Sequence, residues 1–399
     1  MKNLWWLPVL SVGLACWGCR DTSVVSGGAS LRSDTAQVSI RIGSYDGSHD
    51  ALSAVWALAV SPDGERIYAL ENQSRQVRIF NREGGFEATA GGSGGGPGEF
   101  GNPVALGFVG DTLWVADVFS YRYSLFDQQG RFLTDFRPLV MARQGPDDHP
   151  PRPSTLLEDG TLLGSTQAFS REIAEGVVTR MPVLRMRRDG SVIDTVAWRS
   201  VENTGLMIQS PDPKNRPWEI HTRQPFSESW PMVVSGMDST VTRLFLDDTT
   251  RMAELACSGF DGSTVFRTPV GWDSARLDQH VIDSTIAALV NRLATGTIPG
   301  GAPVSDIEEG VRKALYVPEY LPPVAEMLRS SSGDFWLRRA VPQGGVHDQW
   351  RVVSTKGEIL RDVFVPSGVR LRAIHETDLW GTLTDEMDVT FIVRLNVRD

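Results

Sequence analysis

A repeated unit of short β-strands is the feature that most restricts how this 399-residue chain can fold. Residues 68–92, "YALENQSRQVRIFNREGGFEATAGG", and residues 114–138, "WVADVFSYRYSLFDQQGRFLTDFRP", share one order of segments. Each has a β run, a polar turn, a β run ending in Phe-Asn or Phe-Asp, a turn with glycine, and a third β run. The middle runs start at Val77 and Tyr123, 46 residues apart, which is the length expected for one blade of a β-propeller.

Four further copies of the unit can be traced, at residues 155–198, 230–257, 327–365 and 369–397. The last copy stops after three strands, whereas a propeller blade needs four. Residues 36–44, "AQVSIRIGS", are a candidate for the missing strand. Pairing this strand with the last three would close the ring and leave no exposed edge. We therefore predict an all-β fold, a six-bladed β-propeller closed by an N-terminal strand.

Between blades 4 and 5 the chain is too long for a single blade step. Corresponding runs start at Arg243 and Trp350, 107 residues apart. Apolar residues in this stretch recur at the spacing of one helix face, at Ile282, Ile286, Leu289 and Leu293. Residues 305–308, "SDIE", have the pattern of a capping box at the start of a second helix. The sequence predicts a small helical insert over about 272–323, with a disordered loop as the alternative.

The N-terminal stretch "MKNLWWLPVLSVGLACWGC" has the composition of an export signal. One cation, Lys2, precedes an apolar run from Leu4 to Ala15, which is too short to span a bilayer and fits the apolar region of a signal peptide. The run ends in Cys16 and Cys19 among small residues. It resembles a bacterial lipoprotein signal, in which a cysteine is lipidated and becomes the new N-terminus.

We take Cys19 as the lipid-attachment residue because a polar tether begins directly after it. Lipidation at Cys16, a plain cleaved signal and an uncleaved anchor are the alternatives. The predicted organisation is a signal peptide over 1–18, a flexible tether over 19–35 and the propeller over 36–399. This organisation would place the protein in the bacterial cell envelope, exported and lipid-anchored, on the periplasmic side or at the cell surface.

Charge and cysteine content narrow the classes of partner. The net charge of −10 and the lack of any Lys/Arg block argue against a nucleic-acid partner. Removal of residues 1–18 would leave only Cys19 and Cys257, which have no spacing typical of a zinc site or a disulfide framework. Cys257 lies in the apolar stretch "RMAELACSG", so we expect a buried small hydrophobic residue and not a nucleophile.

Residues 91–101, "GGSGGGPGEFG", are unusually rich in glycine. Part of the stretch matches G-x-G-x-x-G, but a strand and not a helix follows it, so the match lacks the context of a dinucleotide site. The sequence has no Gly-Lys-Ser/Thr motif either, and we expect no nucleotide ligand. We interpret the stretch as a joint between blades, where glycine permits the backbone angles of the crossing and Phe100 packs between blades.

Residues 94–133, "GGGPGEFGNPVALGFVGDTLWVADVFSYRYSLFDQQGRFL", resemble an NHL-type repeat, with Gly-x-Gly-x-Phe, a proline, "LWVAD", an arginine and Phe-Asp. The wider pattern is similar to that of bacterial six-bladed β-propeller lipoproteins of the NHL type. The resemblance implies mostly binding roles, with protein, peptide or carbohydrate ligands, and in a minority metal-dependent lyases or hydrolases. Residues 118–121, "VFSY", depart from the pattern, which usually has small polar residues before Arg122.

Propeller ligands usually sit where the axial channel opens, on turns after second strands and on loops that lead into inner strands. On that basis the candidate ligand-facing residues are Arg75, Tyr121, Arg122, His221, Arg223 and His347. Each has a structural alternative. Arg122 would pair with Asp117, and His347 would be a solvated turn residue. His221 and Arg223 lie in a Pro-rich connection that could fold over the channel.

No catalytic residue can be assigned from the sequence. The six histidines are scattered, without H-E-x-x-H spacing, and no G-x-S-x-G nucleophile elbow between a strand and a helix appears. We therefore predict an envelope-anchored binding or scaffolding module for a protein, peptide or carbohydrate ligand, and lean away from an enzyme. A sensing domain for a polysaccharide or peptide is a variant of this hypothesis. The alternative is a metal-dependent lyase or hydrolase at the channel mouth. We predict no cofactor, while a bound calcium or other divalent metal would be compatible with this fold.

Overall fold

The computed structural model describes residues 31–45, 51–117, 120–138, 151–166, 168, 170–212, 214, 217–227, 231–246, 252–295, 302–340 and 345–398. The contacts of the chain divide it into two units, Met1–Leu31 and Arg32–Asp399. The second unit holds all the helices and strands given below. Cys16 and Cys19 lie outside the described residues, so their lipidation stays a prediction.

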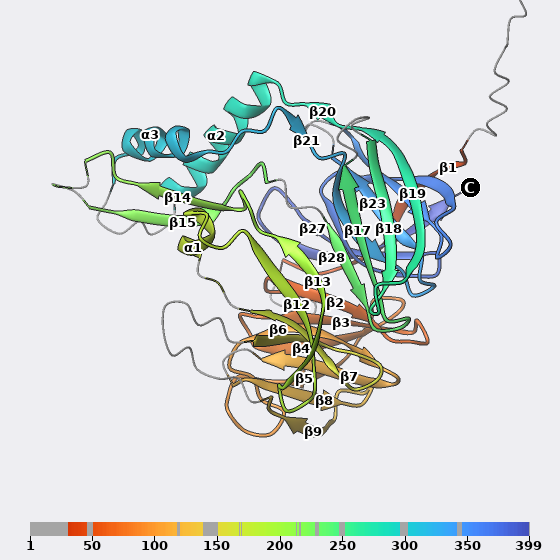
Figure 1. The fold of residues 1–399 in the computed structure, drawn as a ribbon. Helices are drawn as coiled ribbons and strands as arrows, with labels where there is room; N and C mark the ends of the chain where they lie inside the picture. The colour runs from red at the N-terminus through yellow and green to blue at the C-terminus, as the bar shows by residue number, and fades with distance from the viewer. Residues whose placement is uncertain are drawn as a thin grey trace, which may run out of the picture. The chain divides into compact units, whose positions relative to one another are not determined.

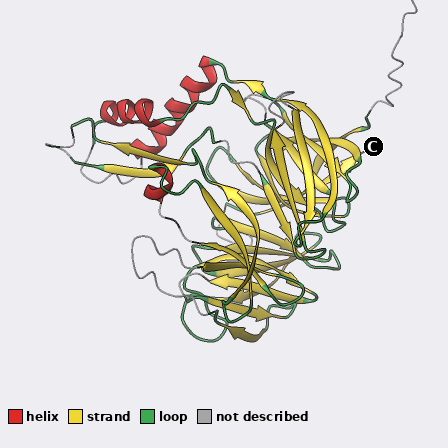
Figure 2. Cartoon of the chain, in the orientation of Figure 1, coloured by secondary structure: helices red, strands yellow, loops and turns green. Residues whose placement is uncertain are grey.

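The second unit is all-β with few helices, as Figure 2 shows. Four of its sheets have four antiparallel strands each, paired in chain order. The first two sheets are β2 (Val55–Val60), β3 (Arg66–Glu71), β4 (Gln76–Asn81) and β5 (Phe86–Gly91), then β6 (Pro103–Val109), β7 (Thr112–Asp117), β8 (Arg122–Phe126) and β9 (Phe132–Phe136). The next two are β10 (Pro151–Leu156), β11 (Leu162–Thr166), β12 (Arg180–Met186) and β13 (Val192–Ser200), then β16 (Met232–Ser235), β17 (Thr240–Leu246), β18 (Met252–Gly259) and β19 (Thr264–Asp273).

The remaining large sheet has eight strands in the order β22-β23-β24-β25-β1-β28-β27-β26. Its members are β22 (Val324–Arg329), β23 (Phe335–Arg339), β24 (His347–Val353), β25 (Ile359–Pro366), β26 (Val369–His375), β27 (Asp378–Thr384), β28 (Thr390–Arg398) and β1 (Ser33–Ile42). The N-terminal strand β1 pairs antiparallel with β28 and parallel with β25. The predicted pairing of an N-terminal strand with the last three strands is therefore confirmed.

The sheets have a propeller-like arrangement (Figure 1). The strands that begin successive groups of four lie side by side. Strand β2 lies beside β6 and β26, β10 lies beside β6, and β22 lies beside β16 and β26. Apolar side chains fill the space between neighbouring sheets. In one cluster Tyr68 of β3 and Leu113 of β7 surround Phe100, which is fully buried between the first two sheets as predicted. Cys257 of β18 is buried in another cluster, which confirms its structural role.

A buried carboxylate holds β1 in the eight-stranded sheet. Asp34 is 3% exposed and accepts hydrogen bonds from Arg32 (2.8 Å) and from Arg361 of β25 (3.0 Å). Burial alone would raise the pKa of Asp34, but the two arginines outweigh it and hold the pKa below its ordinary value. The charged form of Asp34 therefore stabilises the pairing of β1 with β25.

We expect Asp34→Asn to lower the free energy of unfolding by about 1–3 kcal/mol at pH 7, because one charged acceptor of two guanidinium groups is lost. Since the pKa of Asp34 is lower in the folded state, this stabilisation is present above about pH 4, the unfolded value, and is lost as the pH falls through the folded pKa. Urea unfolding across pH 2.5–7 measures the difference. Asp194→Asn, on an exposed position of β13, is the control. Equal stability of Asp34→Asn and wild type at pH 7 would contradict this role.

The glycine-rich stretch is a joint that is fastened by two buried side chains. Arg122 is 2% exposed and donates to the carbonyl oxygens of Gly96 (2.9 Å) and Glu99. Asp117 is 3% exposed and accepts from the backbone N–H of Gly101 (2.5 Å) and of Asn102 (3.1 Å). Each of the two residues thus binds the joint itself, because a glycine loop exposes many backbone donors and acceptors, and the pairing of Arg122 with Asp117 stays a prediction.

The ion pair that the structure records for Arg122 is with Asp135 of β9, at 3.6 Å. The same device occurs in the first sheet. Glu71, at the end of β3, accepts from the backbone N–H of Ser53 at 2.7 Å, and Arg78 donates to the carbonyl of Ala51 at 2.6 Å. In both sheets an acid at the end of the second strand and an arginine in the third fasten the segment that leads into the innermost strand.

A pair of glycine substitutions tests the joint. Gly91 has φ +80°, and a Cβ there would overlap the ring of Phe100. We expect Gly91→Ala to cost about 2–4 kcal/mol of unfolding free energy. Gly95 has open space around its Cα, so Gly95→Ala should change stability by less than about 0.5 kcal/mol. Thermal unfolding of both variants measures the contrast, and similar melting temperatures would show that the close approach of Gly91 to Phe100 is unimportant.

Two insertions pack on each other outside the large sheets. One is the helical segment α2 (Gln279–Thr295) and α3 (Val304–Ala314), flanked by β20 (Ala275–Arg276) and β21 (Tyr320–Leu321). The other is the short helix α1 (Ser170–Ala174) with the hairpin β14 (Gly205–Gln209) and β15 (Glu219–Arg223). One apolar cluster unites Ile208 and Trp218 of the hairpin segment with Leu289 of α2 and Val311 of α3. None of the described helices is long and apolar enough to cross a membrane.

The start of α3 differs from the prediction. The helix begins at Val304, its N-cap is Pro303, and no side chain caps it. Ser305 instead donates to Asp306 at 3.3 Å. The capping-box hypothesis for residues 305–308 is therefore wrong. Pro303 has φ −60° and extended ψ, a conformation that proline adopts readily, so the helix starts one residue before Ser305.

Candidate functional site

Three hollows that share lining residues form a continuous cleft between the second, third and fourth sheets and the hairpin β14–β15. We call it the arginine cleft, defined by Arg152 of β10, Arg199 of β13 and Arg223 of β15. Arg199 lines both the hollow under the hairpin and the middle hollow, and Arg152 lines both the middle hollow and a small third one. The cleft thus joins three arginines of which the first and last are 71 residues apart in the chain.

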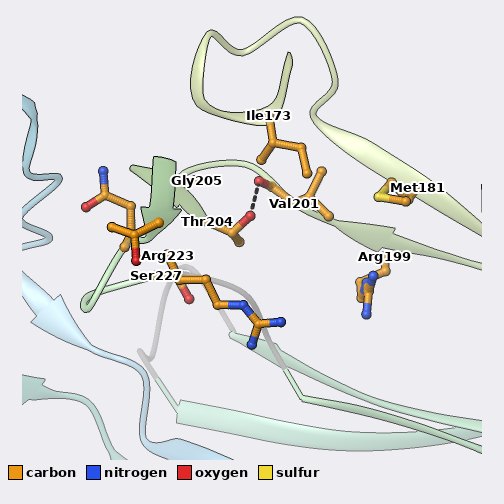
Figure 3. A pocket seen from close by; sticks show the side chains of 10 residues that line it. Ile173, Met181, Arg199, Val201, Thr204, Gly205, Arg223 and Ser227 are labelled. Carbon is orange, nitrogen blue, oxygen red and sulfur yellow. Dashed lines mark hydrogen bonds between the residues drawn. The ribbon is translucent and has the colours of Figure 1, made fainter. Parts of the chain in front are cut away.

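The hollow under the hairpin has a volume of about 640 Å³ (Figure 3). In Figure 3 the side chain of Arg223 extends into it, toward the side where Arg199 lies. Thr204 is held by a hydrogen bond of 2.7 Å to the carbonyl of Val201. The lining residues are Ile173, Met181, Arg199, Val201, Thr204, Gly205, Thr222, Arg223, Gln224 and Ser227.

The middle hollow, of about 560 Å³, lies between β10–β12 of the third sheet and β16 of the fourth. Its lining residues are Arg152, Ser154, Thr155, Leu163, Gly164, Ser165, Thr166, Ala168, Met181, Val183, Arg199, Met232 and Val234. A third hollow, of about 30 Å³, is lined by Ala116, Asp117, Tyr121, Arg122, Tyr123, Pro138, Arg152 and Pro153. The cleft therefore offers methionine, aromatic and hydroxyl groups between guanidinium groups.

The charge of the cleft is positive. Within the described ranges no hydrogen-bond or ion-pair partner is recorded for Arg199 or Arg223. The guanidinium of Arg152 lies 5.3 Å from the ring centroid of Tyr121, and its buried Nε has no partner among the described residues. The one carboxylate in the three linings is Asp117, whose oxygens already accept backbone N–H groups. An anionic ligand would thus meet guanidinium groups with unused donors.

Packing against the helical insert fixes the position of Arg223. The neighbouring Gln224 donates to the carbonyl of Ala314 (3.1 Å) and accepts from the backbone N–H of Tyr316 (3.1 Å). These bonds tie the end of β15 to the C-terminal end of α3 and the residues directly after it. His221 lies two residues before Arg223, and its Nε2 shares a hydrogen bond with Glu219. Hydrogen bonds from His221 and then Gln209 lower the pKa of Glu219, so the His221–Glu219 contact holds the carboxylate on the hairpin surface.

The structure separates the six sequence-predicted residues. Tyr121 and Arg122 meet Arg152 in the small hollow, and Arg223 enters the large one. His221 does not line the cleft, and His347 is an exposed residue at the start of β24. Arg75 donates to Ser93 at 3.0 Å.

Arg75 and Tyr121 occupy the same turn of successive repeats, 46 residues apart, and both have positive φ, +54° and +47°. Arg152 and Arg199 were missed by the sequence analysis. Arg152 lies at the start of an inner strand, a place where ligand contacts were expected, but the third copy of the repeat is too irregular to show that strand clearly.

The described residues contain no group of three or more His, Cys, Asp or Glu side chains arranged to hold a metal ion. These residues therefore supply no metal ligands for the alternative function, a metal-dependent lyase or hydrolase, which stays a prediction.

No protein-family model matches the chain, and no curated protein matches it in sequence. Solved structures similar to it include an exported protein of Bacteroides fragilis NCTC 9343 (11% identity, 92% of this chain and 99% of that one, TM-score 0.44). Another is a gluconolactonase of Xanthomonas campestris (11%, 92% and 98%, TM-score 0.40). A third is a member of the DUF4221 family from Bacteroides vulgatus ATCC 8482 (9%, 91% and 98%, TM-score 0.45). At this level of similarity no ligand or activity is transferred to the chain.

The close contact of α3 with the hairpin yields a prediction. A Cβ at Gly310 would lie 2.7 Å from Ile208 Cγ2 and 3.1 Å from the carbonyl oxygen of Gln209. Alanine normally stabilises a helix relative to glycine by about 1 kcal/mol. We expect the opposite for Gly310→Ala, a loss of about 1–3 kcal/mol through overpacking. Glu309→Ala, on the exposed side of α3, is the control, and chemical unfolding measures both. A stabilised Gly310→Ala variant would contradict this packing.

Proposed function

We propose that the chain is a binding module whose ligand is anionic and occupies the arginine cleft. The observation that carries the proposal is the set of three arginines, Arg152, Arg199 and Arg223, that line connected hollows without a recorded ionic partner among the described residues. Guanidinium groups bind carboxylates and phosphates with two parallel hydrogen bonds. The protein as a whole has a net charge of −10, so these positive side chains stand out against its average charge.

The dimensions and lining of the cleft favour an extended ligand over a compact one. Two hollows of about 640 and 560 Å³ follow each other and share Met181 and Arg199. Apolar contacts to Met181 and Met232 could cover the uncharged faces of such a ligand. An acidic polysaccharide or an acidic segment of a protein satisfies this description, which narrows the ligand classes considered from the sequence.

The six-bladed count is part of the proposal. In the eight-stranded sheet, β22–β25 form one antiparallel set of four, and β26–β28 with β1 form another. The parallel pairing of β1 with β25 would join two blades, which together with the four separate sheets makes six. The NHL-type repeat pattern, export and lipid attachment at Cys19 complete the proposal of a module displayed in the bacterial envelope.

The proposal predicts that polygalacturonate or poly-L-glutamate binds the protein and that uncharged dextran does not. The double variant Arg199→Gln/Arg223→Gln should weaken binding at least tenfold, because each lost charge-assisted hydrogen bond contributes roughly 1.5–3 kcal/mol. Raising the salt concentration from 0.05 to 0.5 M should weaken wild-type binding through screening. Isothermal calorimetry measures the dissociation constants.

Arg292→Gln is the matched control, since it removes one exposed guanidinium from α2 outside the cleft linings. The proposal fails if neither polyanion binds, or if the double variant binds a polyanion as tightly as Arg292→Gln does. Circular dichroism and melting temperature confirm that the variants are folded.

A further inference from the structure

A second hollow, independent of the arginine cleft, lies between β22 and β26. Its volume is about 490 Å³. The lining residues are Glu326, Arg338, Asp348, Gly368, Val369, Arg370 and Arg372. We call it the mixed-charge pocket, because both acidic and basic side chains line it.

Strand alternation builds one wall of this pocket. Leu328, Trp336 and Trp350 belong to the apolar cluster that is shared by the two halves of the eight-stranded sheet. On each of these three strands, a charged residue lies two positions away from the cluster member, and all three charged residues lie toward the same end of the sheet. These residues are Glu326 on β22, Arg338 on β23 and Asp348 on β24. Because side chains two apart share one face of a strand, the charged groups continue the face of the apolar cluster to the sheet end.

The other wall comes from β26. The pairing of β26 with β27 shifts between Leu371 and Ala373, so Arg372 is the extra residue of a β-bulge. Arg370 and Arg372 are two residues apart on the exposed face of β26, and both line the pocket. Val369, which is 4% exposed, joins the pocket to the apolar cluster.

The charged groups of the pocket are unequally satisfied. Arg338 donates to Glu326 at 3.1 Å, and this ion pair neutralises both side chains. For Arg370, Arg372 and Asp348, no ion pair or hydrogen bond of the side chain is recorded among the described residues. The pocket thus presents two unused guanidinium groups and one unused carboxylate, whereas the unused charges of the arginine cleft are all positive.

We propose that the mixed-charge pocket binds a small zwitterion of the α-amino acid type. Arg370 and Arg372 would hold its carboxylate, and Asp348 its ammonium group. Each ligand charge would then meet a complementary protein charge, which avoids a desolvated unpaired ion. Val369 would contact the ligand's side chain. This inference does not rest on the proposed polyanion site, since the two hollows share no lining residue.

The test begins with a thermal-shift screen of the full chain against the twenty standard free L-amino acids at 10 mM. We expect at least one to raise the melting temperature. Calorimetry then compares the best binder with its N-acetyl and its amide derivative. Both derivatives should bind at least tenfold more weakly, because each lacks one of the two charges. If no amino acid raises the melting temperature, or if either derivative binds as well as the parent, the proposal is overturned.

Two variants assign the binding to the pocket. Asp348→Asn and Arg372→Gln should each weaken binding of the free amino acid roughly tenfold or more. Asp194→Asn and Arg292→Gln are the matched controls and should bind as the wild type does. Wild-type affinity in both pocket variants would place the amino acid elsewhere and overturn the proposal. Polyanion binding should be unchanged in both pocket variants, which separates the outcome from that of the arginine cleft.

Discussion

The structure depends on the placement of one N-terminal strand between two others. Strand β1 pairs with β28 on one side and with β25 on the other, and so unites residues at both ends of the chain in one sheet. Without β1, the edges of β25 and β28 would expose unpaired backbone groups to solvent and to other chains. Asp34 secures the strand through Arg32 and Arg361. The edge strand β26 of the same sheet also lines the mixed-charge pocket. The strand β1 that closes the fold and this pocket therefore belong to one sheet.

A second device positions the innermost strands. Glu71 and Asp117 each bind backbone N–H groups of the segment that leads into β2 or β6. Arg78 and Arg122 bind carbonyl groups of the same segments. A loop that crosses from the outside of one sheet to the inside of the next has no strand partner for these groups, so side chains must satisfy them. The glycine-rich stretch is long enough to need this support, and its glycines let Phe100 lie against the backbone of Gly91.

The arginine cleft and the mixed-charge pocket differ in charge for a structural reason. The arginine cleft collects residues from the second, third and fourth sheets and an inserted hairpin. Asp117, the carboxylate in its linings, already accepts backbone N–H groups. The mixed-charge pocket instead continues one strand face of a single sheet, where Glu326 stands opposite Arg338. Unused positive charge alone favours polyanions, whereas unused charges of both signs, on Asp348, Arg370 and Arg372, favour a ligand that carries both.

The sequence by itself determined the local units of this protein. The 46-residue spacing, the apolar face of α2 and the glycine joint are all properties of neighbouring residues, and periodicity reports them directly. Tyr121 and Arg223 were found because they lie in recognisable turns and connections. Only the tertiary structure decided which of these residues meet. Arg152 and Arg199 of the third sheet meet Arg223 of the inserted hairpin in one cleft, and Arg370 and Arg372 of β26 meet Asp348 of β24 in another pocket. Such contacts depend on loop paths and strand register, which a pattern of residue types does not encode.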